Sequence, residues 1–445
     1  MNLASIKNST TFRVLFIGLL ILLLLIPMGM VESVIFERSH LYRQATNEIT
    51  NSWGKEQLLV GPILTLPFDK TFSDNGGWSY DARYQHLRPE TMTVDSRIET
   101  EIRYRGIYEV PVYIATVRFN GVFSLADVGG ADASDAVLQL DDGVIQIPVN
   151  NSRSIKEPIG LVWDGEVIKL TPKWDKAASE TVIFTAKLPA HLLNKHKLHE
   201  FEYEIKLAGS QAFSFMSSAQ KTAITMNSNW ASPSFFGIYL PTSRDISDDG
   251  FTASWTINDL LTDMGHSEQE TVSANWFQGQ QSFGVKLIQP VDTYQVVTRA
   301  AKYAVLFISL TFLIYFFTEL FGNALLHPIQ YLFVGVANCI FYFLLLSLAE
   351  HINFTLAYFI SSGASIALIS LYSRSILKSR AKAVIVFITL SGLYTYLFVT
   401  LRSEGFALLI GSIGLFVILG VAMYLTRNID WRTLNTEVSV EHDSC

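Results

Sequence analysis

The apolar positions of this chain fall into two groups that are separated by a long water-compatible stretch. The first apolar segment, residues 14–30, carries no charge and has nearly the length of the ~20 residues that cross a membrane as a helix. The next begins only at residue 303, so 271 residues, 32–302, lie between the first two segments. This spacing predicts a multi-pass membrane protein with one large domain inserted after its first span.

Five further apolar segments follow the inserted stretch, at residues 303–320, 331–348, 354–371, 383–401 and 406–425. Together with 14–30 they predict a membrane bundle of six transmembrane helices, because each has roughly the length of a span. Lys7 and Arg13 before the first segment are also typical of a signal peptide. We predict an uncleaved anchor, because the apolar run is long and no small-residue cleavage pattern follows it.

Lysine and arginine residues predict the orientation of the spans. With six spans both chain ends lie on one side, whose short segments carry eight basic residues, against one, Arg402, in the opposite short loops. The eight are Lys7, Arg13, Arg374, Lys378, Arg380, Lys382, Arg427 and Arg432. Because the basic side is normally cytoplasmic, we predict that both termini are cytoplasmic and that the large domain lies outside. The predicted parts are a tail with the first helix (1–31), the outer domain (32–302), a five-helix bundle (303–425) and a cytoplasmic tail (426–445).

The outer domain shows the two-residue alternation that is typical of β-strands. In residues 198–207, aromatic and aliphatic side chains alternate with Glu and Lys, which predicts one buried and one wet face. Further strands are expected at 98–104, 111–119, 143–149, 161–170, 180–188, 222–228, 251–257 and 282–289. Their spacing predicts an all-β or mainly-β domain of antiparallel sandwich type. Residues 32–50 instead have helical spacing, and predict a stalk that extends the first span outward.

Charge and missing motifs exclude several classes of function. The outer domain carries 33 acidic and 24 basic residues, a formal balance of −9, so nucleic acid is not an expected partner. The chain has no phosphate-binding loop, no HExxH or CxxC pattern, no dinucleotide fingerprint and no GxSxG elbow. We therefore predict no enzymatic activity, no catalytic residues and no cofactor. Both cysteines, Cys339 and Cys445, lie outside the domain, so its stability depends on its core.

Three histidines, His191, His196 and His199, lie close together in the outer domain. Such a cluster can bind a metal ion, but Lys195 and Lys197 lie among them and no cysteine is near. An exposed turn without a metal is the better interpretation.

Two sets of residues are candidates for contact with a partner or the membrane. The aromatic-rich segment 230–241 can pack on the sheet, lie on the membrane surface or bind a ligand, and packing is the simplest of the three. Two basic residues just before the second span can contact headgroups of the outer leaflet. The candidates are Trp230, Pro233, Phe235, Phe236, Arg299 and Lys302.

Four ionisable residues at span ends are candidates for a transport path, namely Glu319, Glu350, His351 and Glu404. An acid deep within a span indicates transport, but these lie where water is close, so an interfacial role is favoured. Asn338, in the middle of a span, fits a hydrogen bond between helices. The basic residues of 374–382 can bind anionic headgroups of the inner leaflet, although the topology alone also accounts for them.

Six strings spread over the chain serve no generic membrane purpose. They are LLIPMGMVESVIFER (24–38), LVGPILTLP (59–67), MNSNWASPSFFGIYLPTSRDISDDGFTASW (226–255), VDTYQVVTRAAKYAVLFISLTFLIYFFTE (291–319), HPIQYLFVG (327–335) and LLLSLAEH (344–351). In this order and spacing they resemble the CreD family of bacterial inner-membrane proteins, also known as cell-envelope integrity or colicin-tolerance proteins. The resemblance covers nearly the whole chain and is weakest at 131–221.

The resemblance implies an integral protein of the Gram-negative inner membrane with its large domain in the periplasm. Members of the family are associated with envelope maintenance, tolerance to colicins and a two-component response that includes β-lactam stress. The resemblance therefore implies a location and a process, but no particular reaction.

These observations favour a non-enzymatic envelope protein whose outer domain binds a partner or an envelope component, while the helices anchor the domain or transmit its state. The alternative is a transporter or lipid-handling protein, since six helices are enough for a dimeric pathway lined by the span-end acids. An enzyme whose residues converge only in space is a third interpretation with little support. The expected partners are the lipid bilayer and an envelope protein or lipid, and homo-oligomer formation is left open.

Overall fold

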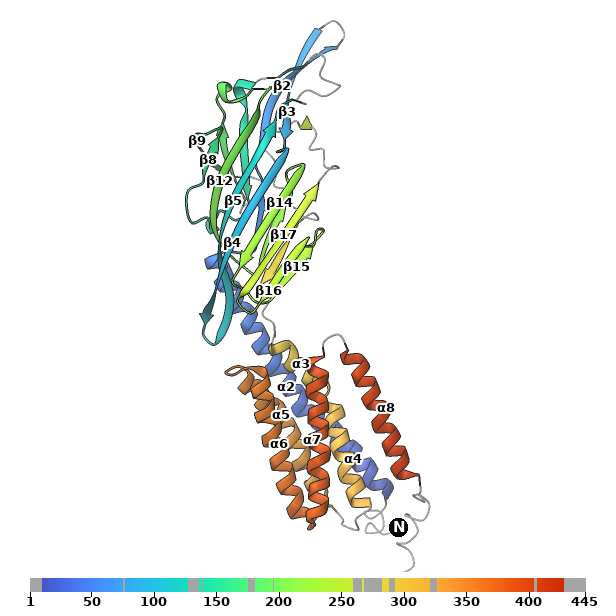
Figure 1. Cartoon of the computed structure of the whole chain (residues 1–445). Coiled ribbons are helices and arrows are strands. Elements are labelled where there is room, and N and C mark those ends of the chain that lie inside the picture. Colours follow the sequence, from blue (N-terminus) through green and yellow to red (C-terminus); the bar gives the residue numbers. More distant parts are fainter. Residues whose placement is uncertain are drawn as a thin grey trace, which may run out of the picture. The chain divides into compact units, whose positions relative to one another are not determined.

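The chain forms two compact units, which are described separately (Figure 1). The helical unit consists of Met1–Arg43 and Val291–Cys445, and the β unit consists of Gln44–Pro290. A computed structural model describes residues 10–74, 77–126, 136–138, 140–174, 181–194, 196–258, 266–267, 282–287, 293–320, 326–403 and 406–427. The expected fold class, membrane helices plus a mainly-β domain, is confirmed.

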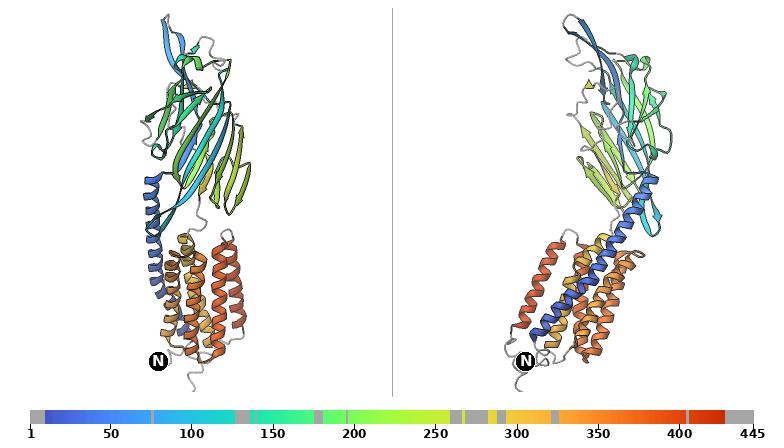
Figure 2. Two further views of the ribbon diagram at one scale, coloured as in Figure 1. Left: turned by 60° about the vertical axis from the view of Figure 1, so that its left-hand side comes forward. Right: turned by 180° about the vertical axis from the view of Figure 1, so that it is seen from behind.

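Seven α-helices are present in the described part of the chain. They are α2 (Thr10–Trp53), α3 (Thr293–Lys302), α4 (Ala304–Leu320), α5 (Pro328–Ala349), α6 (Phe354–Ile376), α7 (Arg380–Arg402) and α8 (Ala407–Thr426). Five of them are long and apolar enough to cross a membrane, and the pair α3–α4, bent by 45°, completes the six predicted spans. Helices α5, α6 and α7 pack side by side in sequence order (Figure 2).

Helix α2 continues far beyond its apolar segment. Its 44 residues correspond to a length of about 66 Å, and the stalk predicted at 32–50 is helical as expected. One face of α2 is buried within the helical unit, at Leu20, Leu24, Met28, Val31 and Ile35. Gly335 on α5 permits this approach, because a Cβ atom there would lie 2.2 Å from Leu24 Cδ1. The domain boundaries predicted at residues 32 and 302 fall inside α2 and at the end of α3.

The β unit consists of two sheets. The first has the order β15 (Pro233–Gly237), β19 (Phe283–Leu287), β13 (Ala212–Met216), β1 (Gln57–Val60), β7 (Val144–Val149), β2 (Ile63–Asp74), β3 (Gly77–Leu87), β18 (His266–Ser267), with β6 (Ala136–Leu138), β11 (Val182–Lys187) and β10 (Thr171–Trp174) attached at its side. The second has the order β16 (Ser243–Ser247), β17 (Gly250–Asn258), β14 (Lys221–Ser228), β4 (Thr91–Arg105), β5 (Tyr108–Ser124), β12 (Leu198–Ser210), β8 (Gly160–Trp163), β9 (Glu166–Lys169). The described pairings are antiparallel, as predicted, except β1 with β13 and β4 with β14, which are parallel.

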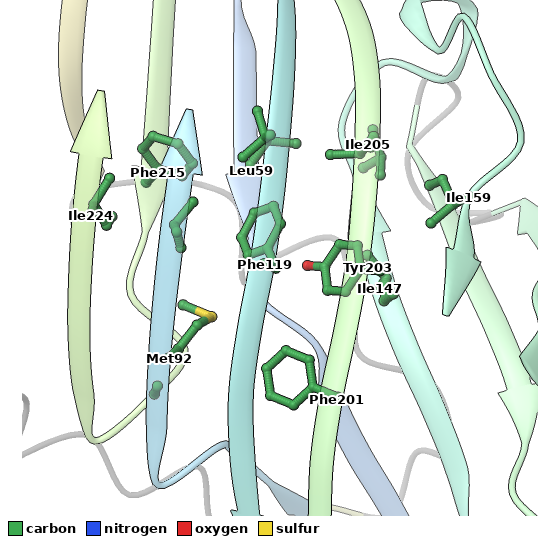
Figure 3. Packing of buried hydrophobic residues seen from close by; sticks show 14 of the residues in the cluster. Leu59, Met92, Phe119, Ile147, Ile159, Phe201, Tyr203, Ile205, Phe215 and Ile224 are labelled. Carbon is green, nitrogen blue, oxygen red and sulfur yellow. The ribbon is translucent and has the colours of Figure 1, made fainter. Parts of the chain in front are cut away.

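The inner faces of the sheets meet in one apolar core. Phe119 of β5 stacks on Tyr203 of β12, with ring centroids 4.6 Å apart, and meets Phe215 of the opposite sheet edge-on at 6.4 Å. Figure 3 shows these rings among the aliphatic residues of both sheets. The alternation predicted for 198–207 is observed in β12, where every second side chain enters this core. Large stacked rings explain how a cysteine-free domain holds two sheets together.

The last turn of α2 is anchored within the β unit at the point where the chain changes sheets. Between β12 and β13, Gln211 adopts a left-handed φ of 65° and turns the chain into the other sheet. Ser210 Oγ donates to Gly54 O at 2.8 Å, and Trp53 Nε1 donates to Tyr113 O at 3.2 Å. Tyr113 Oη in turn donates to Ala212 O at 2.6 Å. These bonds fix the end of α2 to the corner of the sandwich.

Candidate functional site

The aromatic segment 230–241 lies at the edge of the first sheet, and its inward side packs on the core. Phe235 of β15 meets Phe251 and Trp255 of the second sheet edge-on, at centroid distances of 5.6 and 5.8 Å. Tyr239 meets Phe283 at 5.5 Å, and its carbonyl oxygen accepts a hydrogen bond from Trp255 Nε1 at 3.2 Å. The half-buried Trp230 also packs against this cluster. Packing on the sheet, the simplest interpretation, therefore describes this side of the segment.

The outward side of the same segment exposes apolar surface. Ile238 and Leu240 alternate with the inward Tyr239 and are 51% and 70% exposed. Phe236 is half-buried, and the Lys286 ammonium lies 5.2 Å from the centre of its ring. We call Phe236, Ile238 and Leu240 the outer edge. The aromatic rings on the inward side of the segment pack in the core, so the position of the outer edge is fixed relative to the sheet.

Pro233 and Gly237 shape this strand. Pro233 occupies the first position of β15, where the missing N–H of proline is tolerated at a sheet edge. Gly237 has a φ of 103°, and a Cβ atom there would lie 2.2 Å from Ser282 O. The strand therefore has to end at a glycine before it reaches Ile238.

The histidine cluster divides into exposed and buried members. His191 and His196 are exposed, as the predicted turn requires, but the prediction is wrong for His199, which is buried. Its Nδ1 lies 2.8 Å from Asp164 Oδ2, and Asn194 N donates to its Nε2 at 3.0 Å. Since both ring nitrogens have partners within the fold, the geometry favours a structural role.

Asp164 occupies the turn between β8 and β9, where its φ of 49° is left-handed. Burial raises the pKa of its carboxyl group, but hydrogen bonds from His199, the Glu200 amide and Lys197 outweigh burial, so this pKa lies below its usual value. The carboxylate therefore stays ionised and organises the turn. Trp163 covers His199, with stacked rings 5.6 Å apart.

Two of the span-end acids are nearly buried and form ion pairs with more exposed arginines of α2. Glu319, whose side chain is 6% exposed, lies 2.9 Å from Arg13 and accepts a hydrogen bond from Tyr331 Oη at 2.8 Å. Glu350, at 9%, accepts from Tyr294 Oη at 3.1 Å and lies 3.8 Å from Arg38. Sequence spacing could not reveal these partners, because 306 residues separate Arg13 from Glu319.

The two ion pairs are about one membrane thickness apart. Arg13 and Arg38 are 25 positions apart on one continuous helix, which corresponds to ~37 Å along the axis. A hydrocarbon core measures ~30 Å. The two ion pairs therefore have the spacing expected if they attach α2 to the other helices near opposite membrane surfaces. This favours a structural role for both acids. A transport path through Glu319 and Glu350 stays a prediction.

The remaining candidates are spread out. Arg299 and Lys302 lie in the last turn of α3, where Lys302 is exposed and Arg299 is half-buried, so headgroup contact stays a prediction for both. His351 is exposed just after α5. Glu404 lies outside the residues that the structure describes. Asn338 makes the expected bond between helices, since it accepts from Tyr394 Oη of α7 at 3.1 Å.

Comparison with known proteins identifies similar sequences over nearly the full length. Residues 9–432 match the family described as Inner membrane protein CreD. The chain is 30% identical over 418 residues to Inner membrane protein CreD of Escherichia coli (strain K12), a match that covers 92% of this chain and 91% of that protein. Among solved structures, an M1 zinc metallopeptidase of Deinococcus radiodurans aligns with a TM-score of 0.20 and 9% identity over 38% of this chain and 39% of the enzyme. So low a TM-score supports no inference.

Proposed function

This chain belongs to the CreD family of inner-membrane proteins, and we propose that it supports the integrity of the cell envelope by binding an envelope component through its β unit. In this proposal the β unit lies in the periplasm and both termini lie in the cytoplasm, as the distribution of basic residues suggests. The helices anchor the β unit. Tolerance to colicins and to β-lactam stress would follow from the bound state, without a chemical reaction.

The observation that carries this proposal is the outer edge. Exposed strand edges with apolar side chains invite pairing with other chains, and soluble proteins usually protect them with charges. Here Ile238 and Leu240 are exposed beside an edge strand of the first sheet, while Phe235, Tyr239 and Trp255 fix the strand from behind. A surface that is already rigid loses little conformational entropy on binding. An extended peptide of an envelope protein is the partner that best fits such an edge.

Photocrosslinking in cells tests the proposal. A photoreactive phenylalanine analogue at Ile238 or at Leu240 is expected to give one or a few discrete adducts with an envelope component. The matched control is Val167 of β9, which is 78% exposed in the second sheet and should give none of these adducts. The same diffuse products from all three positions would contradict a binding surface at the outer edge.

A second candidate function is the handling of lipids, and it is favoured by a large apolar groove in the helical unit. The groove lies among α4, α7 and α8 and has a volume of about 1010 Å³. Ligand pockets usually occupy ~300–1,000 Å³. This function would use the helices and not the β unit, so the two candidates can be tested independently.

A further inference from the structure

The groove exists because α8 packs on α7 only locally. Tyr396 of α7 donates a hydrogen bond to Ile410 O at 2.9 Å, and a Cβ atom at Gly414 would lie 2.3 Å from Tyr396 Oη. This contact holds α8 at one point, and no residue of α8 is buried within the described part of the chain. Between α8 and α4 the space stays open, and Leu313 and Ile413 line it from the two sides.

The wall formed by α7 is nearly continuous apolar surface from Lys382 to Tyr396. These residues are 14 positions apart, which corresponds to ~21 Å along the helix axis. One leaflet contributes about half of the ~30 Å hydrocarbon core, so the groove is long enough for a complete acyl chain. Gly392 lines the groove ~15 Å along the helix axis from Lys382, and nothing lies within 4 Å of the position that its Cβ atom would take.

Several of the described residues at one end of the groove are basic. Lys382 lines this end, with Thr318 of α4 and Leu425 of α8. The exposed residues Lys378, Arg380 and Arg427 lie at the adjacent ends of α7 and α8. Glu319, next to Thr318, is paired with Arg13 and so is already neutralised. An anionic group is therefore the electrostatic complement of this end.

We propose that the groove binds an anionic phospholipid, with an acyl chain along Gly392 and the phosphate beside Lys382 and Arg380. The apolar wall favours binding of the acyl chain, and the basic residues at one end favour a headgroup with negative charge. The selected lipid is phosphatidylglycerol or another phospholipid with net negative charge.

Native mass spectrometry of the full-length protein in mild detergent tests this proposal. The probes are phosphatidylglycerol and phosphatidylethanolamine with identical acyl chains. The wild-type protein is expected to retain the anionic lipid at least fivefold better. Gly392→Leu places a side chain in the groove and should reduce the bound lipid at least fivefold. Gly363→Leu on α6 is the matched control, because its Cβ position is also open but lies outside the groove lining, and it should bind as the wild type does.

A variant that removes one basic side chain separates the contribution of the lipid headgroup to binding from that of the acyl chain. Lys382→Gln should lower the preference for phosphatidylglycerol about fivefold, since one basic residue near a membrane surface contributes ~1 kcal/mol. Arg402→Gln, at the opposite end of α7, should leave the preference unchanged. Equal binding of the two lipids, or full lipid retention by Gly392→Leu, would overturn the proposal. A lipid-free dimer that Gly392→Leu dissociates would also overturn it, because the groove would then be an interface between copies.

Discussion

Replacing Trp255 by alanine is expected to lower the free energy of unfolding of the β unit by about 3–5 kcal/mol, the usual cost of truncating a buried tryptophan. The indole is almost fully buried between the sheets and meets Phe235 and Phe283 at 5.8 and 6.0 Å. Its Nε1 also donates to Tyr239 O. The substitution therefore removes the support of the outer edge together with part of the core.

Urea unfolding of the full-length protein, followed by the β-sheet signal in far-UV circular dichroism, measures this change. Trp174→Ala is the matched control, because Trp174 is exposed on β10 and its loss should change the stability by no more than ~0.5 kcal/mol. Trp255→Phe keeps a ring but loses the hydrogen bond, so its stability should fall between the two. Equal midpoints for Trp255→Ala and Trp174→Ala would contradict the assigned packing.

Replacing Glu319 by glutamine is expected to destabilise the helical unit by about 3 kcal/mol. Removing one partner of a buried ion pair typically costs 3–5 kcal/mol, because the other charge stays without compensation. The lower value applies here because the Arg13 side chain is partly exposed and can regain water. Arg13→Gln should have an effect of similar size.

The double variant Arg13→Gln with Glu319→Gln should be less destabilised than the sum of the single variants, because no uncompensated charge is left. Titration with sodium dodecyl sulfate, followed by the helical circular dichroism signal, measures all three. Arg402→Gln is the control, since the exposed Arg402 makes a solvent-exposed hydrogen bond to the Thr355 hydroxyl and should contribute little. Additive losses in the double variant would show that the two charges do not stabilise each other.

Local patterns predicted the elements of this fold well. Apolar runs in the sequence correspond to α2 and to α4–α8, and alternation in 198–207 corresponds to β12. These signals are local, because a span needs only apolar length and a half-buried strand only a period of two. Alternation gives the faces of a strand but not its neighbours. The alternation pattern therefore does not predict the parallel pairs β1–β13 and β4–β14.

The candidate site was predictable only in part. The aromatic content of 230–241 marks the segment as a candidate, but only the folded structure separates the inward Phe235 and Tyr239 from the exposed Ile238 and Leu240. The sequence shows Glu319 as an acid at a span end, yet its partner Arg13 is distant in sequence, and its position before the first span indicates only the orientation of that span. Contacts between distant segments decide both cases, and a single sequence carries no direct signal of them.

The proposed orientation of the β unit is tested most directly by single-cysteine labelling in cells. Leu240→Cys places a thiol on the outer edge, and Lys378→Cys places one between α6 and α7. Both are made with Cys445→Ser, while Cys339 is buried in α5. A maleimide that cannot cross the inner membrane should label Leu240→Cys at once, and Lys378→Cys only after that membrane is permeabilised. Labelling in the reverse order would place the β unit in the cytoplasm and contradict its proposed role in the envelope.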